Sequence, residues 1–186
     1  MTLPNPKKLE AGALATKTLL AGDTFFRVHL NKYEADHYTD NLRYAVPEGC
    51  LYLSNSSLGA FSETFGTQLK QKFIAREELE NRSLSLFTLV EDIELVSFAG
   101  MDLLTNGYDA SINSGPHPDT HPIAESVFAN PNDYSGIWWP ARHCTTEFCV
   151  ALFKDRSNYD VRNLATLDTR TDIIKYIEEY KAEIID

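Results

Sequence analysis

The sequence of this 186-residue chain contains few cysteines and no excess of positive charge. Its three cysteines form an odd set without the spacing of a disulfide scaffold, so we expect reduced thiols and a cytoplasmic protein. Lysine and arginine number 17 against 27 aspartates and glutamates, which gives a net charge of −10. This balance disfavours nucleic acid and anionic membrane as main partners, although it does not determine the charge of a local pocket.

Long apolar runs and glycine-rich nucleotide loops are also missing. No run approaches the roughly 20 apolar residues of a membrane span. The segment 11–21, after the charged N-terminus, is interrupted by threonine and lysine, unlike a secretory core. Neither a Walker loop nor a GxGxxG motif is present, so a P-loop or Rossmann fold has no support.

The composition and the order of elements predict one α+β domain over residues 1–186. Hydrophobic residues make up 43% and charged residues 24%, values typical of a globular chain. We expect a mixed, twisted β-sheet with flanking helices and a core at about 24–155. The patterns predict strands at 24–30, 50–54, 83–90, 93–98, 136–139 and 147–153, and helices at 7–20, 56–66 or beyond, 123–129 and 169–184. Residues 31–49 are predicted to form a long loop, a kind of segment that often carries function.

The helix expected at 169–184 has an apolar face made by Ile173, Ile174, Ile177 and Tyr180. A threonine at 169 or 171 is its expected cap. Packing of this face on the domain is one interpretation, and binding of a partner protein is the other.

Three residues suggest a binding site. Arg27 alternates with Phe26 and Val28 on the first strand, Tyr52 lies in a second strand, and Glu63 follows on a helix, opposite its apolar stripe. Arginine binds phosphate bidentately, a tyrosine ring stacks on a cationic ring, and a carboxylate stabilises an oxocarbenium-like state. The alternative is a surface-paired arginine, a half-buried strand tyrosine and a solvated glutamate. Arg43, in the long loop, is either a second phosphate ligand or a solvent-exposed cation.

The histidines and cysteines do not have the spacing of a metal site. His117 and His121 are separated by four positions, but adjacent prolines oppose a regular helix there, and Cys144 and Cys149 are too far apart for a zinc knuckle. We expect no metal. Cys144 next to His143 is a poor nucleophile–base pair, because adjacent residues in an extended segment point to opposite sides.

Taken in order, these segments resemble the RES-domain family, which is named for arginine, glutamate and serine. The resemblance covers about residues 25–153. It is carried by Phe-Phe-Arg27-Val, Asn-Leu-Arg43-Tyr, Tyr52-Leu-Ser through Ala60-Phe-Ser-Glu63-Thr, Asp102-Leu-Leu, Thr120-His-Pro-Ile-Ala, Gly136-Ile-Trp-Trp-Pro-Ala-Arg-His and Val-Ala-Leu-Phe153. Members are mostly toxins of bacterial toxin–antitoxin pairs with a fold similar to ADP-ribosyltransferases.

The resemblance implies an enzyme that consumes NAD as its substrate, by transfer of ADP-ribose to water, phosphate or a protein acceptor. It implies that Arg27 and Arg43 hold the pyrophosphate, that Tyr52 stacks near the nicotinamide and that Glu63 supports the oxocarbenium state. It also implies a separately encoded helix-turn-helix antitoxin that blocks the cleft.

The chain departs from the family at two places. Ala141 occupies the position of the family's serine, and Arg43 lacks the usual flanking glycine and tryptophan. The alternative is therefore a catalytically impaired module that binds NAD or a protein. A hydroxyl from Thr120, Ser62 or Ser135 is a candidate replacement for the missing serine.

Overall fold

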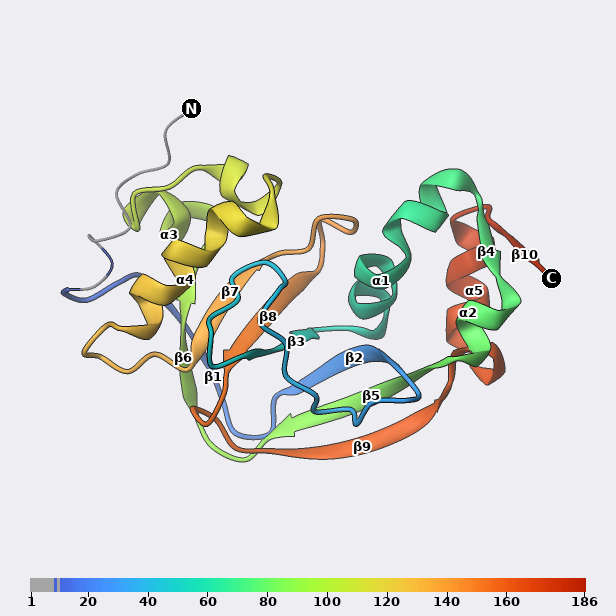
Figure 1. Cartoon of the computed structure of the whole chain (residues 1–186), viewed down its shortest axis with the longest axis horizontal. Helices are drawn as coiled ribbons and strands as arrows, with labels where there is room; N and C mark the ends of the chain where they lie inside the picture. Colours follow the sequence, from blue (N-terminus) through green and yellow to red (C-terminus); the bar gives the residue numbers. More distant parts are fainter. Residues whose placement is uncertain (1–8, 10) are drawn as a thin grey trace.

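A computed structural model of the chain, which describes residue 9 and residues 11–186, shows an α+β fold built on an eight-stranded mixed sheet (Figure 1). The strand order is β1-β6-β7-β8-β3-β2-β5-β9, and a separate two-stranded sheet pairs β10 with β4. The strands are β1 Thr16–Leu19, β2 Thr24–Leu30, β3 Cys50–Ser54, β4 Phe73–Ala75, β5 Arg82–Leu89, β6 Ile93–Ser97, β7 Gly136–Pro140, β8 Phe148–Phe153, β9 Tyr159–Thr166 and β10 Glu183–Ile185.

Helices lie at both ends of the sheet, with α3 and α4 at one end and α1, α2 and α5 toward the other (Figure 1). Their bounds are α1 Ser57–Gln71, α2 Arg76–Glu80, α3 Gly100–Thr105, α4 His121–Phe128 and α5 Thr171–Glu179, with 3-10 turns at Ala110–Asn113, His117–Thr120 and Leu167–Thr169. Within the described residues, no helix is long and apolar enough to cross a membrane. This arrangement confirms the predicted α+β class.

The sheet is split between β2 and β3. These neighbours share one residue pair, Phe26 with Ser54, whereas β2 pairs with β5 over its whole length. Likewise β3 pairs with β8 over all five of its residues. The strands β2 and β3 therefore diverge and leave an opening in the middle of the fold.

Three apolar clusters surround this opening. One lies under α3 and α4, a second contains Phe25 and Phe87 together with Leu53 and Val150 from the other part of the sheet, and the third packs α1 and α5 together. Because side chains alternate along a strand, each central strand supplies two clusters at once. The opening is thus flanked by well-packed elements.

Helix α1 begins as the sequence predicts. The Ser56 hydroxyl accepts a hydrogen bond of 2.9 Å from the Gly59 N–H, which caps the helix. Phe61 and Phe65 are fully buried in the third cluster. Glu63 lies about 200° around the helix from each of them, so it faces away from that cluster.

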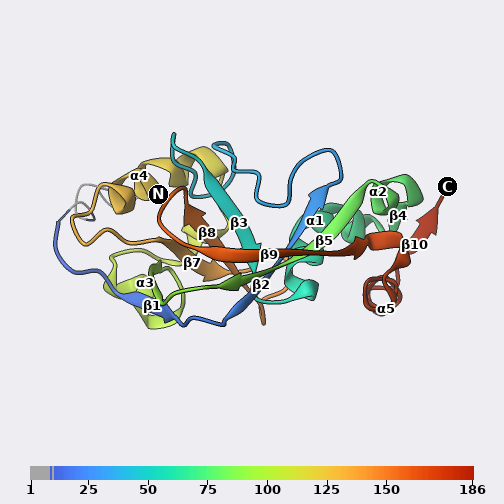
Figure 2. The same ribbon diagram turned by 90° about the horizontal axis from the view of Figure 1, so that it is seen from below.

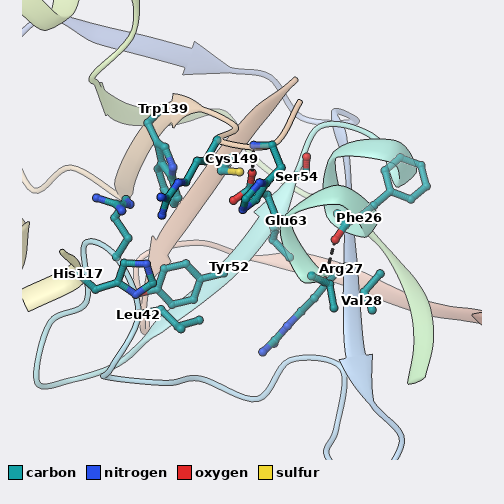
Figure 3. A pocket seen from close by; sticks show the side chains of 16 residues that line it. Phe26, Arg27, Val28, Leu42, Tyr52, Ser54, Glu63, His117, Trp139 and Cys149 are labelled. Carbon is teal, nitrogen blue, oxygen red and sulfur yellow. Dashed lines mark hydrogen bonds between the residues drawn. The ribbon is translucent and has the colours of Figure 1, made fainter. Parts of the chain in front are cut away.

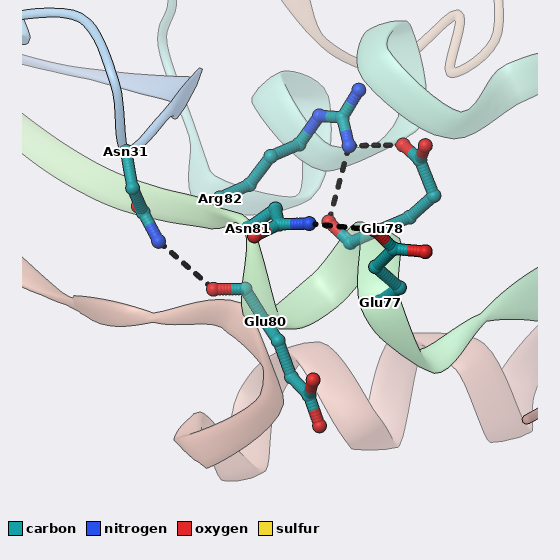
Figure 4. Close-up of polar contacts among 6 residues, drawn as sticks. All are labelled: Asn31, Glu77, Glu78, Glu80, Asn81 and Arg82. Carbon is teal, nitrogen blue, oxygen red and sulfur yellow. Dashed lines mark hydrogen bonds and ion pairs between the residues drawn. The ribbon is translucent and has the colours of Figure 1, made fainter.

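The beginning of β5 is tied to α2 and to the end of β2 by polar contacts (Figure 4). The Arg82 guanidinium donates to the Glu78 carboxylate and main-chain carbonyl, and the Asn81 amide donates to the Glu77 carboxylate. The Asn31 amide donates to the Glu80 carbonyl at 2.8 Å. These contacts fix the point at which the long loop 31–49 leaves β2.

The structure corrects the prediction for the N-terminal region. A helix was predicted over 7–20, of which residues 7, 8 and 10 lie outside the described residues. Residues Thr16–Leu19 instead form β1, which pairs with β6 in antiparallel register. Two β-branched threonines and the ladder with β6 outweigh the local helix formers.

The strands on both sides of the Glu91-Asp92 turn do not form a hairpin. β5 pairs with β2 and β9, whereas β6 pairs with β1 and β7, so the turn connects the two parts of the split sheet. The strand β9 was not predicted at all. Tyr159-Asp160-Val161-Arg162 alternates over only four positions before Asn163 breaks the pattern, so the local signal for this strand is short.

The C-terminal helix is shorter than the predicted 169–184. Helix α5 ends at Glu179, and Lys181 then adopts a left-handed conformation with φ 55°. The chain continues as β10, which runs parallel to β4. Neither threonine caps α5, because Arg170 occupies the N-cap position without a side-chain hydrogen bond. Pairing with β4, a contact remote in sequence, ends the helix.

We expect Ile173→Ala to lower the free energy of unfolding by about 2–5 kcal/mol, because Ile173 is fully buried in the third cluster. Glu178→Ala, an exposed change on the same helix, is the control and should have little effect. Urea unfolding of the two variants measures the difference. Equal stabilities would contradict packing of α5 on the domain and favour a partner-binding helix.

Candidate active site

A cavity of about 380 Å³ lies at the split in the sheet, within the size range of small-molecule sites. Its lining comes from both parts of the sheet, from α1, from the long loop and from the segment that links β7 to β8 (Figure 3). The ionisable lining residues are Arg27, Arg43, Tyr52, Glu63, His117, Arg142, His143 and Cys149. The lining includes three arginines and one carboxylate, so with neutral histidines its net charge is positive in a chain of net charge −10.

Glu63 is the acidic group of the cavity. It extends from α1 and lines the cavity (Figure 3), while Phe61 and Phe65 of the same helix lie in the third apolar cluster. Its Oε1 accepts a hydrogen bond of 2.9 Å from the main-chain N–H of His143. The loop after β7 therefore orients this carboxylate, and no Lys or Arg forms a salt bridge with it among the described residues.

Arg43 and Arg142 supply positive charge on the side of the cavity formed by the loops. Arg43 is 6% exposed, and its guanidinium donates to the carbonyls of Ile112 and Gly115 at 2.6 and 2.7 Å. Burial lowers the pKa of Arg43, which the nearby Arg142 also lowers and Glu63 raises. Arg142 is exposed and has no hydrogen-bond partner among the described residues. The two arginines and Glu63 line the same cavity and interact electrostatically.

Arg27 lies in the cavity wall with its guanidinium against the long loop. Its Nη1 donates to the carbonyls of Ala35 and His37 at 2.7 and 2.8 Å. Phe26 and Val28 pack on the α1 side of β2, so the alternation directs Arg27 to the other side. In Figure 3 its side chain extends away from Glu63. In this structure the Arg27 guanidinium holds the long loop in place through these two hydrogen bonds.

Three aromatic residues line the cavity, Phe26, Tyr52 and Trp139, and two of them are in contact. The rings of Tyr52 and Trp139 meet edge to face, with centroids 6.5 Å apart. Burial raises the pKa of Tyr52, so the phenol stays protonated. Its hydroxyl lies near the Cys50 thiol, and it has no hydrogen-bond partner among the residues that the structure describes. A buried polar group without a partner is costly. This hydroxyl is itself enclosed by protein atoms and does not open into the cavity.

Two histidines complete the polar lining. Burial lowers the pKa values of His117 and His143, and Arg142 lowers both further, while Glu63 raises them. Both rings are therefore neutral at pH 7. The His143 ring occupies the space left by Gly66 of α1, where an added Cβ would lie 2.3 Å from the ring. The absent side chain at Gly66 thus allows the loop after β7 to approach α1.

The thiols are not arranged as nucleophiles. Burial raises the pKa of Cys149 well above its usual value, so this cavity residue is a neutral thiol. Cys144 is half-buried and does not line the cavity, while the neighbouring His143 does. Within the described part of the chain, no group of three His, Cys, Asp or Glu side chains is arranged to hold a metal ion.

Ala141, which the resemblance places at the family's serine position, lies next to the cavity lining but not in it. Ala141 is 2% exposed and packs in the first apolar cluster. Thr120, Ser62 and Ser135, which the sequence suggested as substitutes, do not line the cavity either. The hydroxyl groups that do belong to Ser54, Thr64 and Tyr52. The Ser54 and Thr64 hydroxyls donate to main-chain carbonyls, which leaves Tyr52 as the one without a partner.

The structure therefore brings Arg43, Tyr52 and Glu63 together, and it turns the Arg27 guanidinium toward the loop. Sequence reasoning missed Arg142 and His117 as members of the site. Arg142 lies in the loop three residues after the predicted strand 136–139, and loops often carry functional side chains. No comparable local signal marks His117, which reaches the cavity from a 3-10 turn.

Residues 28–172 match the profile of the RES domain. The match spans most of the chain, and the chain belongs to the RES domain family.

Among solved structures, the chain is similar to a chain of the M. tuberculosis MbcT–MbcA toxin–antitoxin complex. The TM-score is 0.58 at 14% sequence identity, and the alignment covers 88% of this chain and 91% of that one. The comparison confirms the predicted ADP-ribosyltransferase-like RES fold. A comparison with curated proteins finds no match.

Proposed function

We propose that the chain is the toxin of a toxin–antitoxin pair and cleaves the nicotinamide–ribose bond of NAD. The observation that carries this proposal is the cavity at the sheet split, where Glu63, oriented by the His143 N–H, lines the same space as Arg43 and Arg142. A positive site with one fixed carboxylate suits a ligand that combines a pyrophosphate with a developing cation. Such a ligand explains why an acidic chain gathers arginines in this one place.

In the proposed reaction, the bond between ribose C1′ and the nicotinamide nitrogen breaks, and its electron pair passes to the ring nitrogen. Water, phosphate or a protein side chain then supplies the electron pair for the new bond to C1′ and releases a proton. The intermediate state resembles an oxocarbenium ion. The Glu63 carboxylate stabilises that positive charge, either below C1′ or through the ribose hydroxyls.

The other cavity residues bind and orient NAD in this proposal. Arg43 and Arg142 hold the pyrophosphate, and Tyr52 places its ring near the nicotinamide. The Nε and Nη2 atoms of Arg27 have no hydrogen-bond partner among the described residues, so Arg27 can contact a phosphate while it still anchors the loop. The reaction needs no metal in this scheme, and it would take place in the cytoplasm.

The proposal also includes a separately encoded helix-turn-helix antitoxin. It is supported by family membership and by the structural likeness to a chain of a toxin–antitoxin complex. An antitoxin that covers the cavity would prevent NAD from entering.

Release of nicotinamide from NAD tests the proposal. The purified chain should release nicotinamide from NAD in at least one of three reactions, which contain water alone, added inorganic phosphate or candidate protein acceptors. Liquid chromatography measures the released nicotinamide. Mass spectrometry of the second product distinguishes ADP-ribose, its phosphorylated form and a modified protein. Absence of release under all three conditions would argue against an NAD-cleaving enzyme.

A second candidate is a catalytically impaired RES module that binds NAD or a protein. The observation that favours it is Ala141, which places no hydroxyl at the family's serine position. Calorimetry that shows NAD binding without nicotinamide release would support it. A gain of release in Ala141→Ser would show that the missing hydroxyl is what limits turnover.

A further inference from the structure

The outermost strand, β9, has one edge that no described strand covers. It is the last strand in the order of the sheet, and among the described strands it pairs with β5 alone. Figure 2 shows β9 along the outside of the molecule. Residues 160–163 are all exposed, and Val161 keeps 41% of its surface accessible. An open edge of this length is a template for pairing with another strand.

The pairing with β5 determines which backbone groups point outward from β9. The Val90 N–H donates to the Asn158 carbonyl at 3.1 Å, and these two residues are opposite each other in the extended register. Hydrogen-bonded and non-hydrogen-bonded pairs alternate in an antiparallel ladder. Tyr159, Val161 and Asn163 therefore direct their N–H and C=O groups away from β5, toward the free edge.

The sequence of this edge is complementary to itself. Val161 is preceded by Asp160 and followed by Arg162. If a second β9 pairs in antiparallel orientation about a two-fold axis at Val161, Asp160 of each copy lies opposite Arg162 of the other. The outward-facing Val161 residues then exchange hydrogen bonds with each other, and Tyr159 does so with Asn163 of the second copy. Both the backbone groups and the charges match in this one register.

We propose that two copies of this chain associate through β9, antiparallel about a two-fold axis at Val161, and so join their sheets into one. The interface is isologous, as in most homodimers. It covers the exposed Val161 side chain and satisfies the outward backbone groups of β9. It uses residues outside the cavity, since Asp160, Val161 and Arg162 do not line it.

Light scattering after size-exclusion chromatography tests the association. The wild-type chain should show a mass that rises with concentration toward twice its 21.0 kDa. In the dimer, the amides of Tyr159, Val161 and Asn163 should exchange with deuterium more slowly as the concentration increases.

Charge reversal tests the register. Arg162→Asp places two aspartates opposite each other at both symmetry-related positions, so the dissociation constant should rise roughly tenfold or more. The double variant Asp160→Arg with Arg162→Asp exchanges the two charges and should restore the wild-type value. Lys175→Asp, which makes the same change in net charge at an exposed site on α5, should leave association unchanged.

A monomer at every concentration of the wild-type chain would overturn the proposal, as would pairing with a strand of another protein in place of self-association. A dimer that Arg162→Asp does not weaken would also overturn it, because its interface would lie elsewhere. Circular dichroism of each variant confirms that the fold is retained.

Discussion

Replacement of Glu63 by glutamine should reduce nicotinamide release from NAD by roughly 10²- to 10³-fold, with little change in the KM for NAD. The amide keeps the shape of the side chain, and its oxygen still accepts the hydrogen bond from the His143 N–H. The lost feature is the negative charge, which acts on the oxocarbenium-like state more than on bound NAD. Steady-state kinetics measures kcat and KM separately.

Glu125→Gln is the matched control for this variant. Glu125 is exposed on α4 and lies outside the cavity lining, so the same chemical change there should leave nicotinamide release unaffected. Thermal unfolding of both variants should agree with that of the wild-type chain. If Glu63→Gln releases nicotinamide as fast as the wild-type chain, the Glu63 carboxylate has no role in NAD cleavage.

Replacement of Arg142 by glutamine should weaken NAD binding roughly 10- to 100-fold, because a charge-assisted hydrogen bond to a phosphate contributes about 1.5–3 kcal/mol. Arg142 is exposed and without a partner among the described residues, so its removal should not change the free energy of unfolding. Calorimetric titration with NAD measures the dissociation constant directly. The loss should be smaller at high salt, where the wild-type interaction is also screened.

Two comparisons make this prediction specific. Lys154→Gln removes an exposed positive charge outside the cavity and should leave NAD binding unchanged. Arg27→Gln should instead lower stability, because it removes the two hydrogen bonds to the carbonyls of Ala35 and His37. Suppose that NAD binding is unchanged in Arg142→Gln but strongly weakened in Arg27→Gln, and that Arg27→Gln keeps the wild-type stability. Arg27, and not Arg142, would then be the residue that binds the phosphate.

Much of the fold follows from local patterns. The strand over Thr24–Leu30 and the helix that begins after Ser56 are evident in the sequence, because alternation, helical spacing and capping are properties of neighbouring residues. The same local reasoning fails for β1, β9 and β10. The strand conformation of β1, β9 and β10 depends on pairing with β6, β5 and β4, which are remote along the chain. In β9, moreover, apolar and polar residues alternate over only four positions.

The candidate site divides in the same way. The helical position of Glu63, opposite Phe61 and Phe65, already allows it to face a cleft, and the structure places it there. Its contact with His143 joins residues 80 positions apart, which no local pattern predicts. Membership of Arg142 and His117 in the site depends likewise on loops that meet only in the folded chain.

The sequence alone determined the α+β class, the order of the motifs typical of RES domains and the direction in which Glu63 leaves its helix, because each is set by the chemistry and spacing of nearby residues. Only the tertiary structure decided that the sheet splits between β2 and β3, that the Arg27 guanidinium holds the long loop, and that Arg142, Arg43 and Glu63 line one cavity. These features arise from backbone pairing and packing between distant segments, for which a single sequence carries no local signal.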